Sequence, residues 1–208
     1  LFPIINPNKP AFSYENERHK HTAVIDIVIY QLEQVFERLL QKQLDDPAIN
    51  DDLEIIDFCV QELYFTLIRE KENSNPNQVE VNRGHYFNHI KIVLSLIVQQ
   101  SKDFQGGFML AHTGYYFMQL VNELFSYSPA FMLDLATGIV DSAAANSFTY
   151  DSSTLKEILE LSERVMADHK DILADSGNFN RLLSMLDHFA NSGWQEALEL
   201  TWRLKDIF

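Results

Sequence analysis

Helix breaks and helix-start signals follow one another at short intervals over residues 128–208, and they constrain the fold more than any other feature. Ser128 and Pro129 pair an N-cap residue with a proline at the first helical position. Thr154 and Glu157 have the spacing of a reciprocal capping box. No loop between these helices is long enough to hold an active site of its own. The pattern predicts closely packed antiparallel helices.

Apolar side chains recur at helical spacing through most of the chain and predict eight helices. The first two are expected at 17–44 and 52–71, with Asp51 as the N-cap of the second. The helix that follows the glycines at 106–107 is apolar around its circumference, so we expect it to be central. The other expected boundaries are starts near 85, 129 and 154, a stop for the sixth helix at Gly177, a start near 178, and Ser192 as the N-cap of the last helix.

Alternate helices are expected to start near 85, 129 and 178. The intervals between these starts are close to the 40–47 residues of a HEAT or armadillo unit. We therefore expect an all-α fold of antiparallel helix pairs, an irregular HEAT/armadillo-like α-solenoid, with an irregular helical bundle as the alternative. The expected organisation is an extended lead-in at 1–16, a first helix pair at 17–71, a polar loop at 72–83 and a helical-repeat region at 84–208, with 17–208 as one continuous domain.

The chain carries a formal net charge of −14. This charge disfavours non-specific binding to nucleic acid, because such binding depends on Lys and Arg side chains at the phosphates. Its single cysteine, Cys59, forms no internal disulfide and no cysteine-based zinc site, which favours a reducing, cytoplasmic compartment. No apolar run approaches the ~18–20 residues of a membrane span, and no signal peptide is present. Because the chain begins with Leu-Phe-Pro instead of Met, we expect either a piece of a longer protein or a start that is processed or unseen.

Histidines supply the first candidate chemistry. His85 and His89 are four residues apart and share one helix face, and His112 on the next helix could be a third ligand. Three histidines in a helical bundle resemble the metal site of DinB-like enzymes, which would imply a histidine-metal hydrolase. The pair lacks the glutamate of H-E-x-x-H, however, and histidines at this spacing are common by chance.

Arginine followed at short range by histidine supplies the second candidate. Arg164 and His169 fit R-x4-H, and Arg181 and His188 fit R-x6-H. Both resemble the R-x4–6-H motif of HEPN ribonucleases, all-helical enzymes that cleave RNA without metal. That resemblance implies a proton-transferring His169 and an Arg164 that stabilises phosphorane charge. The residue after each arginine is apolar here, whereas that family often has a polar one, and about one match is expected by chance.

Two residue clusters complete the candidates. The carboxylates crowded into 45–57 lack the glycine that a calcium loop needs, so helix capping and solvation are expected there. The aromatic group at 115–131 is expected either in the core or around a pocket of a small-ligand or sensor module. No phosphate-binding, dinucleotide-binding or nucleophile-elbow motif is present, and no cofactor is expected.

Four stretches, 129–135, 151–157, 163–171 and 193–208, resemble the closing segment of very large bacterial multidomain proteins. In those proteins an ATP-binding module comes first and a long HEAT-like helical region ends the chain. The similarity covers about 125–208 and contains no catalytic residue. It implies that this chain is a C-terminal scaffold fragment of such a protein.

These observations lead to one primary prediction. We expect a non-enzymatic helical scaffold or protein-interaction module whose partner is another protein or another domain of its parent chain. The alternatives are a HEPN-like metal-independent ribonuclease, a histidine-metal helical hydrolase and a small-ligand module.

Overall fold

The structure is a computed structural model that describes residues 14–39, 41, 48–73, 76–103, 107–144 and 151–207. All regular secondary structure in these ranges is helical, as predicted. The elements are α1 (Tyr14–Leu39), α2 (Ala48–Asn73), α3 (Pro76–Asp103), α4 (Gly107–Leu124), the 3₁₀ helix η1 (Phe125–Tyr127), α5 (Pro129–Ala144), α6 (Ser152–Asp168), the 3₁₀ helix η2 (Lys170–Ala174), α7 (Ser176–Asn191) and α8 (Gln195–Lys205).

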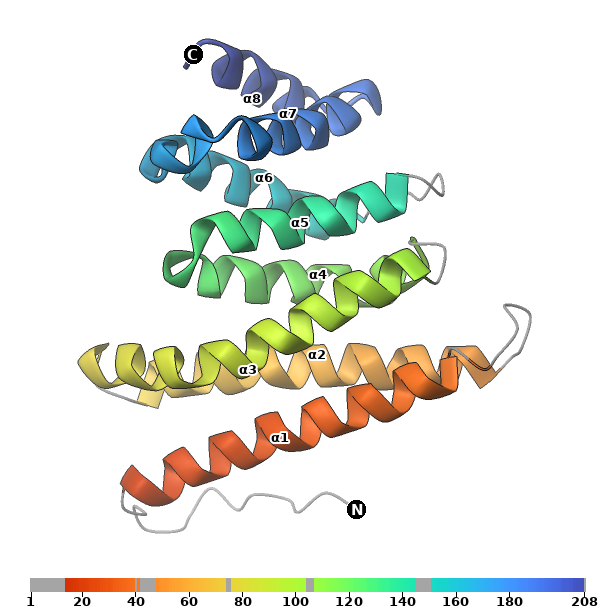
Figure 1. Cartoon of the computed structure of the whole chain (residues 1–208), viewed down its shortest axis with the longest axis vertical. Coiled ribbons are helices and arrows are strands. Elements are labelled where there is room, and N and C mark those ends of the chain that lie inside the picture. The colour runs from red at the N-terminus through yellow and green to blue at the C-terminus, as the bar shows by residue number, and fades with distance from the viewer. Residues whose placement is uncertain are drawn as a thin grey trace.

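The helices form two layers. The odd-numbered helices pack on one another in the order α1, α3, α5, α7, and the even-numbered helices in the order α2, α4, α6, α8. The substantial contacts between described α-helices join elements no more than two apart in chain order. The result is an elongated stack, with α1 at one end of its long axis and α8 at the other (Figure 1).

One hydrophobic core runs the length of this stack, from Ile25 in α1 to Leu204 in α8. The prediction that the fourth helix is central is confirmed, because α4 packs on α2, α3, α5 and α6. Phe117, Leu120 and Leu124 of α4 are fully buried. An all-round apolar helix is stable in water only where neighbours cover several of its sides, as they do here.

Two predicted helix starts have different outcomes. Pro129 is the first residue of α5, as its fixed φ favours, and the amide of Met132 donates to the carbonyl of Ser128. The prediction of Asp51 as an N-cap is wrong, because α2 begins at Ala48 and Asp51 lies in its first turn. A carboxylate still stabilises the helix there, since it faces the positive end of the macrodipole.

The predicted capping box of α6 is also wrong. Asp151 is the N-cap, and its carboxylate accepts hydrogen bonds from the backbone amides of Ser153 and Thr154 at 2.8 Å each. The Thr154 hydroxyl donates to the second oxygen of Asp151 instead of capping the helix. Glu157 does not reach back to the cap, because side-chain amides of α4 hold its carboxylate.

The predicted stop of the sixth helix at Gly177 is wrong as well. Helix α6 ends at Asp168 and the chain continues through η2. Gly177 lies in the first turn of α7, whose N-cap Asp175 accepts from the amide of Asn178. The capping signal at Asp175 therefore outweighs the glycine that follows it.

Ser192 does not cap α8, contrary to prediction, but belongs to the end of α7. Its hydroxyl donates to the carbonyl of His188, and α8 begins at Gln195. Gly193, with a φ of +95°, closes α7. The amide of Gly193 donates to the carbonyl of Ala190 and that of Trp194 to the carbonyl of Phe189, which is the hydrogen-bond pattern of a Schellman motif.

The expected polar loop at 72–83 is largely helical. Helix α2 extends to Asn73 and α3 begins at Pro76, so residues 76–83 form the first two turns of α3. Proline tolerates the first position of a helix, because its fixed φ suits that position and its missing N–H would have no partner there. Of the lead-in expected at 1–16, residues 14–16 begin α1 and the rest lies outside the described residues. Among the described helices, none is both long and apolar enough to cross a membrane.

Candidate functional site: the groove between α6 and α8

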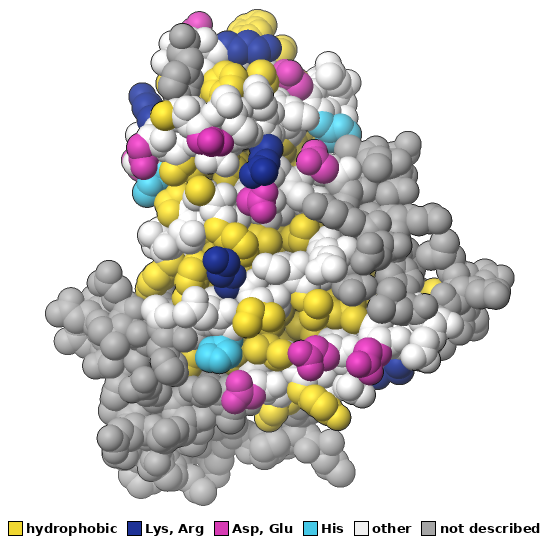
Figure 2. All heavy atoms as spheres, viewed as in Figure 1, with side chains coloured by type: hydrophobic (Ala, Val, Ile, Leu, Met, Phe, Trp, Pro, Cys, Tyr) yellow, Lys and Arg dark blue, Asp and Glu magenta, His cyan; other side chains and the backbone are white. Residues whose placement is uncertain are grey.

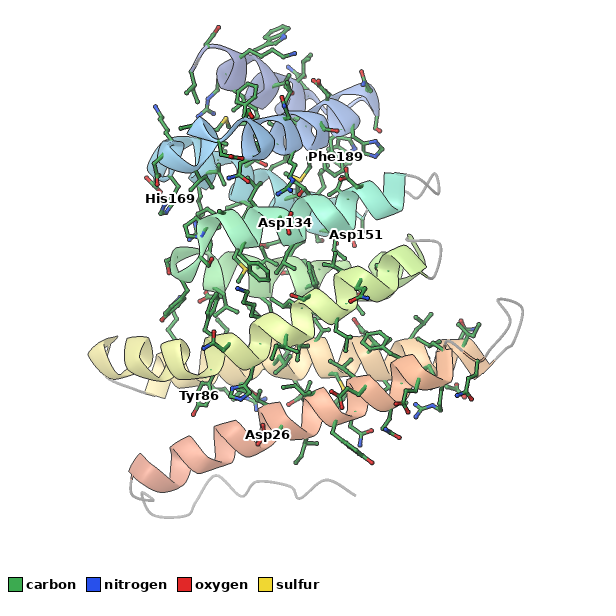
Figure 3. All side chains as sticks on the ribbon, in the orientation of Figure 1. Asp26, Tyr86, Asp134, Asp151, His169 and Phe189 are labelled. Atoms are coloured by element: carbon green, nitrogen blue, oxygen red, sulfur yellow. The ribbon has the colours of Figure 1, made fainter. Side chains whose placement is uncertain are left out.

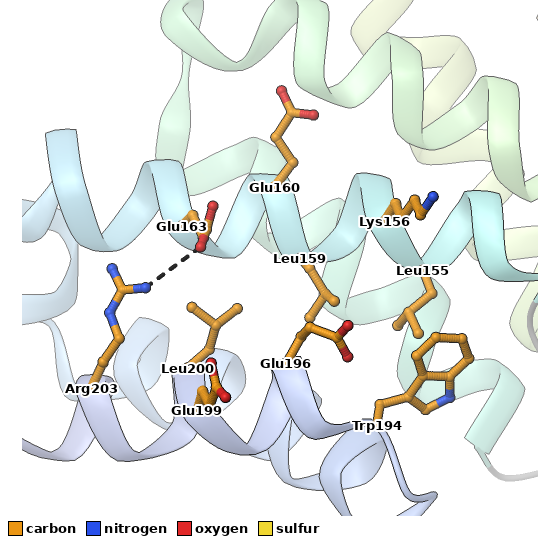
Figure 4. Close-up of a pocket in the computed structure, with 10 residues that line it drawn as sticks. All are labelled: Leu155, Lys156, Leu159, Glu160, Glu163, Trp194, Glu196, Glu199, Leu200 and Arg203. Carbon is orange, nitrogen blue, oxygen red and sulfur yellow. Dashed lines mark hydrogen bonds and ion pairs between the residues drawn. The ribbon is translucent and has the colours of Figure 1, made fainter.

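A groove of about 530 Å³ separates α6 from α8. Figure 4 shows the two helices side by side and running in the same direction, with Leu155 and Trp194 at one end and Glu163 and Arg203 at the other. The ten residues that line the groove are Leu155, Lys156, Leu159, Glu160, Glu163, Trp194, Glu196, Glu199, Leu200 and Arg203.

The groove combines an apolar floor with charged walls. Leu155 and Leu200 belong to the core, and half-buried Leu159 and Trp194 pack against that core. The wall on α6 carries Glu160 and Glu163, and the wall on α8 carries Glu196 and Glu199. Apolar surface surrounded by polar side chains is the usual anatomy of a protein-binding surface.

One ion pair crosses the groove. Nη1 of Arg203 lies 3.5 Å from Oε1 of Glu163, and both side chains are more than half exposed. The carboxylates of Glu160, Glu196 and Glu199 have no ion-pair partner among the described residues. With Lys156 as the other lining cation, the groove keeps a net negative charge.

The end of α7 determines where Trp194 lies. Because Gly193 adopts a left-handed conformation, the chain reverses within two residues, and Trp194 becomes the residue directly before α8. Its carbonyl accepts the first hydrogen bond of α8, from the amide of Leu198. The indole therefore lies at one end of the groove, and the Arg203–Glu163 ion pair lies at the other end (Figure 4).

Arg164 and His169 do come together, but around an aromatic ring. The Arg164 guanidinium lies 4.8 Å from the centroid of Phe125, and the His169 ring meets the same Phe125 edge to face at 5.1 Å. Nη1 of Arg164 also donates to the backbone carbonyl of Asn122 at 2.7 Å. Figure 3 shows His169 at the edge of the stack, where α6 ends. These contacts tie α6 to the end of α4.

The second arginine–histidine pair is engaged separately. Arg181 forms an ion pair with Asp134 of α5, with Nη1 2.8 Å from Oδ1. The ring of His188 meets that of its neighbour Phe189 at 5.4 Å. Arg181 thus links α7 to α5.

The histidine-metal prediction falls partly outside the described side chains. His89 is half-buried in α3, whereas the side chains of His85 and His112 are not among those described. In the part of the chain that the structure describes, no group of three or more His, Cys, Asp or Glu residues could hold a metal ion.

The aromatic group around 115–131 is divided between core and surface. Phe117 and Phe125 are fully buried. The ring centroids of Tyr115 and Tyr116 are 5.2 Å apart, and Tyr116 also contacts Tyr64 and Phe65 of α2. Glutamine side chains donate to both hydroxyls, Gln119 to Tyr115 and Gln61 to Tyr116. The pKa of Tyr115 is raised, mainly by burial and secondly by the negative charge of the nearby Glu157. These rings pack α2 against α4.

Two further candidates have structural explanations. Within the acidic stretch 45–57, Asp52 is buried and accepts two hydrogen bonds from Arg38, at 2.7 and 3.0 Å, which join α1 to α2. Cys59 is buried, and burial together with Glu62 raises the pKa of its thiol to about 11. The thiol is therefore neutral at physiological pH and is a poor nucleophile.

A second surface, which is more apolar and less charged than the α6–α8 groove, covers another part of the molecule. Figure 2 shows hydrophobic side chains gathered over the middle of one face, across α3 and α5, with scattered charges between them. Ile92 of α3 is 59% exposed.

The sequence predicts the groove residues as helical but does not bring them together. Leu159 and Leu200 have the spacing of core positions, and the glutamates have that of solvated helix faces. Comparison with known proteins adds no further assignment, since no protein-family model, curated protein or solved structure matches this chain.

Proposed function

We propose that this chain is a non-enzymatic helical scaffold that binds a protein segment in the groove between α6 and α8. The observation that carries the proposal is the groove itself, in which half-buried Leu159 and the half-buried Trp194 lie between two charged walls, above buried leucines. Stacked helices build extended surfaces suited to such contacts.

The contacts of the arginine–histidine pairs support a scaffold over a ribonuclease. Arg164 already donates to a backbone carbonyl and lies over the ring of Phe125, and Arg181 is paired with Asp134. A guanidinium that stabilises a phosphorane must instead present its donors to the substrate. The acidic composition also disfavours an RNA substrate.

We further propose that the array is a HEAT-like repeat region that acts in the cytoplasm, as a C-terminal part of a larger bacterial protein. The two-layer order of the helices supports the first point, and a single buried cysteine supports the second. In this proposal the bound segment comes from a protein partner or from another domain of the parent chain.

A displayed library of random peptides, selected on the immobilised chain, tests the proposal. We expect the enriched peptides to lose binding when Leu159→Glu places a charge on the groove floor. They should keep binding to Ile92→Glu, which makes the same change at an exposed position on α3. Circular dichroism establishes that both variants are folded.

Two results would overturn the proposal. If no enriched peptide distinguishes Leu159→Glu from Ile92→Glu, the groove is not the binding surface. If the purified chain cleaves RNA and Arg164→Ala abolishes the cleavage, the chain is an enzyme and not a scaffold.

A further inference from the structure

We infer that the α6–α8 groove selects one class of partner, a basic amphipathic helix of about three turns. This inference rests on the proposed function and makes it more specific by stating the fold, length and charge of the bound segment. It follows from the charge, the backbone and the dimensions of the groove.

The charge comes from both walls. Glu163, which pairs with Arg203, lies on the α6 side, and Glu196 and Glu199, which have no ion-pair partner among the described residues, project from α8, so carboxylates lie on either side of the groove. Figure 4 shows the carboxylates of Glu196 and Glu199 on the side of α8 that faces the groove, whereas the carboxylate of Glu160 points away from α8. A segment with Lys or Arg on both sides of an apolar stripe complements this arrangement, whereas an acidic segment is repelled. The net charge of −14 also steers a basic segment toward the molecule.

The backbone of the groove favours a helical occupant. Both walls are α-helices, whose main-chain groups are hydrogen-bonded within the helix along their length. An extended peptide would find no strand edge to pair with, and its own amides and carbonyls would lose water without gaining partners. A helix satisfies its backbone internally and needs only side-chain contacts from the groove.

The dimensions set the length of the occupant. Helix α8, the shorter wall, has 11 residues, which corresponds to roughly 16 Å or three turns. Over that length one face of a partner helix presents apolar residues every third or fourth position. These would contact half-buried Leu159 and the indole of Trp194, a residue type that is common among those contributing most to binding energy.

The test uses a synthetic peptide of about 14 residues, with blocked ends, leucine at every third or fourth position and lysine or arginine on the flanking positions. Its affinity for the full chain is measured by fluorescence anisotropy at low and at high salt. We expect Glu196→Lys/Glu199→Lys to weaken binding by roughly tenfold or more at low salt, and by less at high salt, where charges are screened. The peptide should become helical on binding, as shown by circular dichroism.

A matched variant separates the groove from net charge. Glu33→Lys/Glu37→Lys makes the same charge change on exposed positions of α1, at the far end of the stack. We expect this variant to alter affinity by less than about twofold. A second peptide with serine in place of leucine should lose binding to the unmodified chain, which tests the apolar floor without altering the protein.

Three outcomes would overturn the inference. Equal weakening by the α1 and α8 variants would mean that the peptide responds to overall charge. Equal binding of a peptide with glutamate on the flanking positions would mean that the groove does not select basic partners. Displayed peptides that depend on Leu159 but are neutral, acidic or extended would also contradict the inference, while leaving the proposed function intact.

Discussion

Gly193 has a φ of +95°, a conformation that side chains with a Cβ adopt only with strain. A Cβ at this position would meet no atom within 4 Å, so a substitution tests backbone conformation alone. We expect Gly193→Ala to lower the free energy of unfolding by about 1 kcal/mol, measured by urea denaturation. It should also weaken any binding that depends on the position of Trp194.

Gly84 supplies the control for this prediction. It lies exposed inside α3, and a Cβ there would also meet nothing within 4 Å. Because its backbone is helical, Gly84→Ala should raise the free energy of unfolding by up to about 1 kcal/mol. If the two substitutions shift stability in the same direction, the left-handed conformation at Gly193 is wrong.

Asp151 adds a pH-dependent contribution at the start of α6. Burial alone would raise the pKa of its carboxyl, but hydrogen bonds from Thr154 and Ser153 outweigh burial and lower it. The stabilisation is therefore complete above the unfolded pKa of about 3.9 and is lost as the pH falls through the lower folded pKa. We expect Asp151→Ala to cost about 1 kcal/mol at pH 7, and the difference from the unmodified chain to shrink in acid.

Asp151→Asn separates capping from charge. Asparagine caps helices about as well as aspartate but does not titrate in this range. This variant should be about as stable as the unmodified chain near neutral pH. In thermal melts between pH 3 and pH 7, its loss of stability in acid should be smaller, and an identical pH profile would mean that Asp151 does not contribute through its charge.

Between elements, a set of polar contacts joins α4 to α6. One oxygen of Glu157 accepts from Gln119 at 2.9 Å and the other from the buried Asn122 at 2.8 Å. Glu157→Ala would leave both amides without this acceptor, so we expect a loss of about 1–3 kcal/mol in the free energy of unfolding. Glu160→Ala, on an exposed position of the same helix, should change it by less than about 0.5 kcal/mol. Equal effects of the two substitutions in chemical denaturation would contradict a role for this network.

The same network explains which parts of the structure can be predicted from sequence. Hydrophobic periodicity identifies the helices and the central place of α4, because burial of an apolar stripe is encoded locally. The start of α6 is not identified, since Thr154 and Glu157 have the right spacing but Asp151 lies in a better position to bind the free amides. Glu157 instead accepts hydrogen bonds from side chains of α4, which lie far away in the sequence. No local sequence pattern predicts these partners.

The candidate groove is unpredictable for a related reason. Leu159 is spaced like any core residue, and its partial exposure depends on how α6 and α8 lie after packing on α4 and α7. The glutamates of the walls are typical of solvated helix faces until two such faces meet. Local sequence therefore specifies each wall, whereas tertiary packing creates the space between them.

At the scale of the whole molecule, contacts between neighbouring helices determine how far a local loss of structure spreads along the stack. Because the substantial contacts of the described helices extend no more than two helices along the chain, α1 and α2 have little direct coupling to α7 and α8. A repeat array with such contacts loses structure locally, since each unit is stabilised by its own helices and its neighbours. A closed helical bundle, in which the helices all pack around a common centre, would instead unfold as a unit.

Truncating a fully buried leucine at one end of the stack distinguishes these two behaviours. Leu204→Ala in α8 removes core contacts worth about 2–5 kcal/mol. In hydrogen exchange followed by mass spectrometry, we expect faster exchange in α7 and α8 and unchanged protection in α1 and α2. Leu32→Ala, at a fully buried position of α1, should give the reverse pattern. If either substitution speeds exchange equally at both ends, the helices form one cooperative bundle, and binding in the α6–α8 groove would then stabilise the whole chain instead of its C-terminal end.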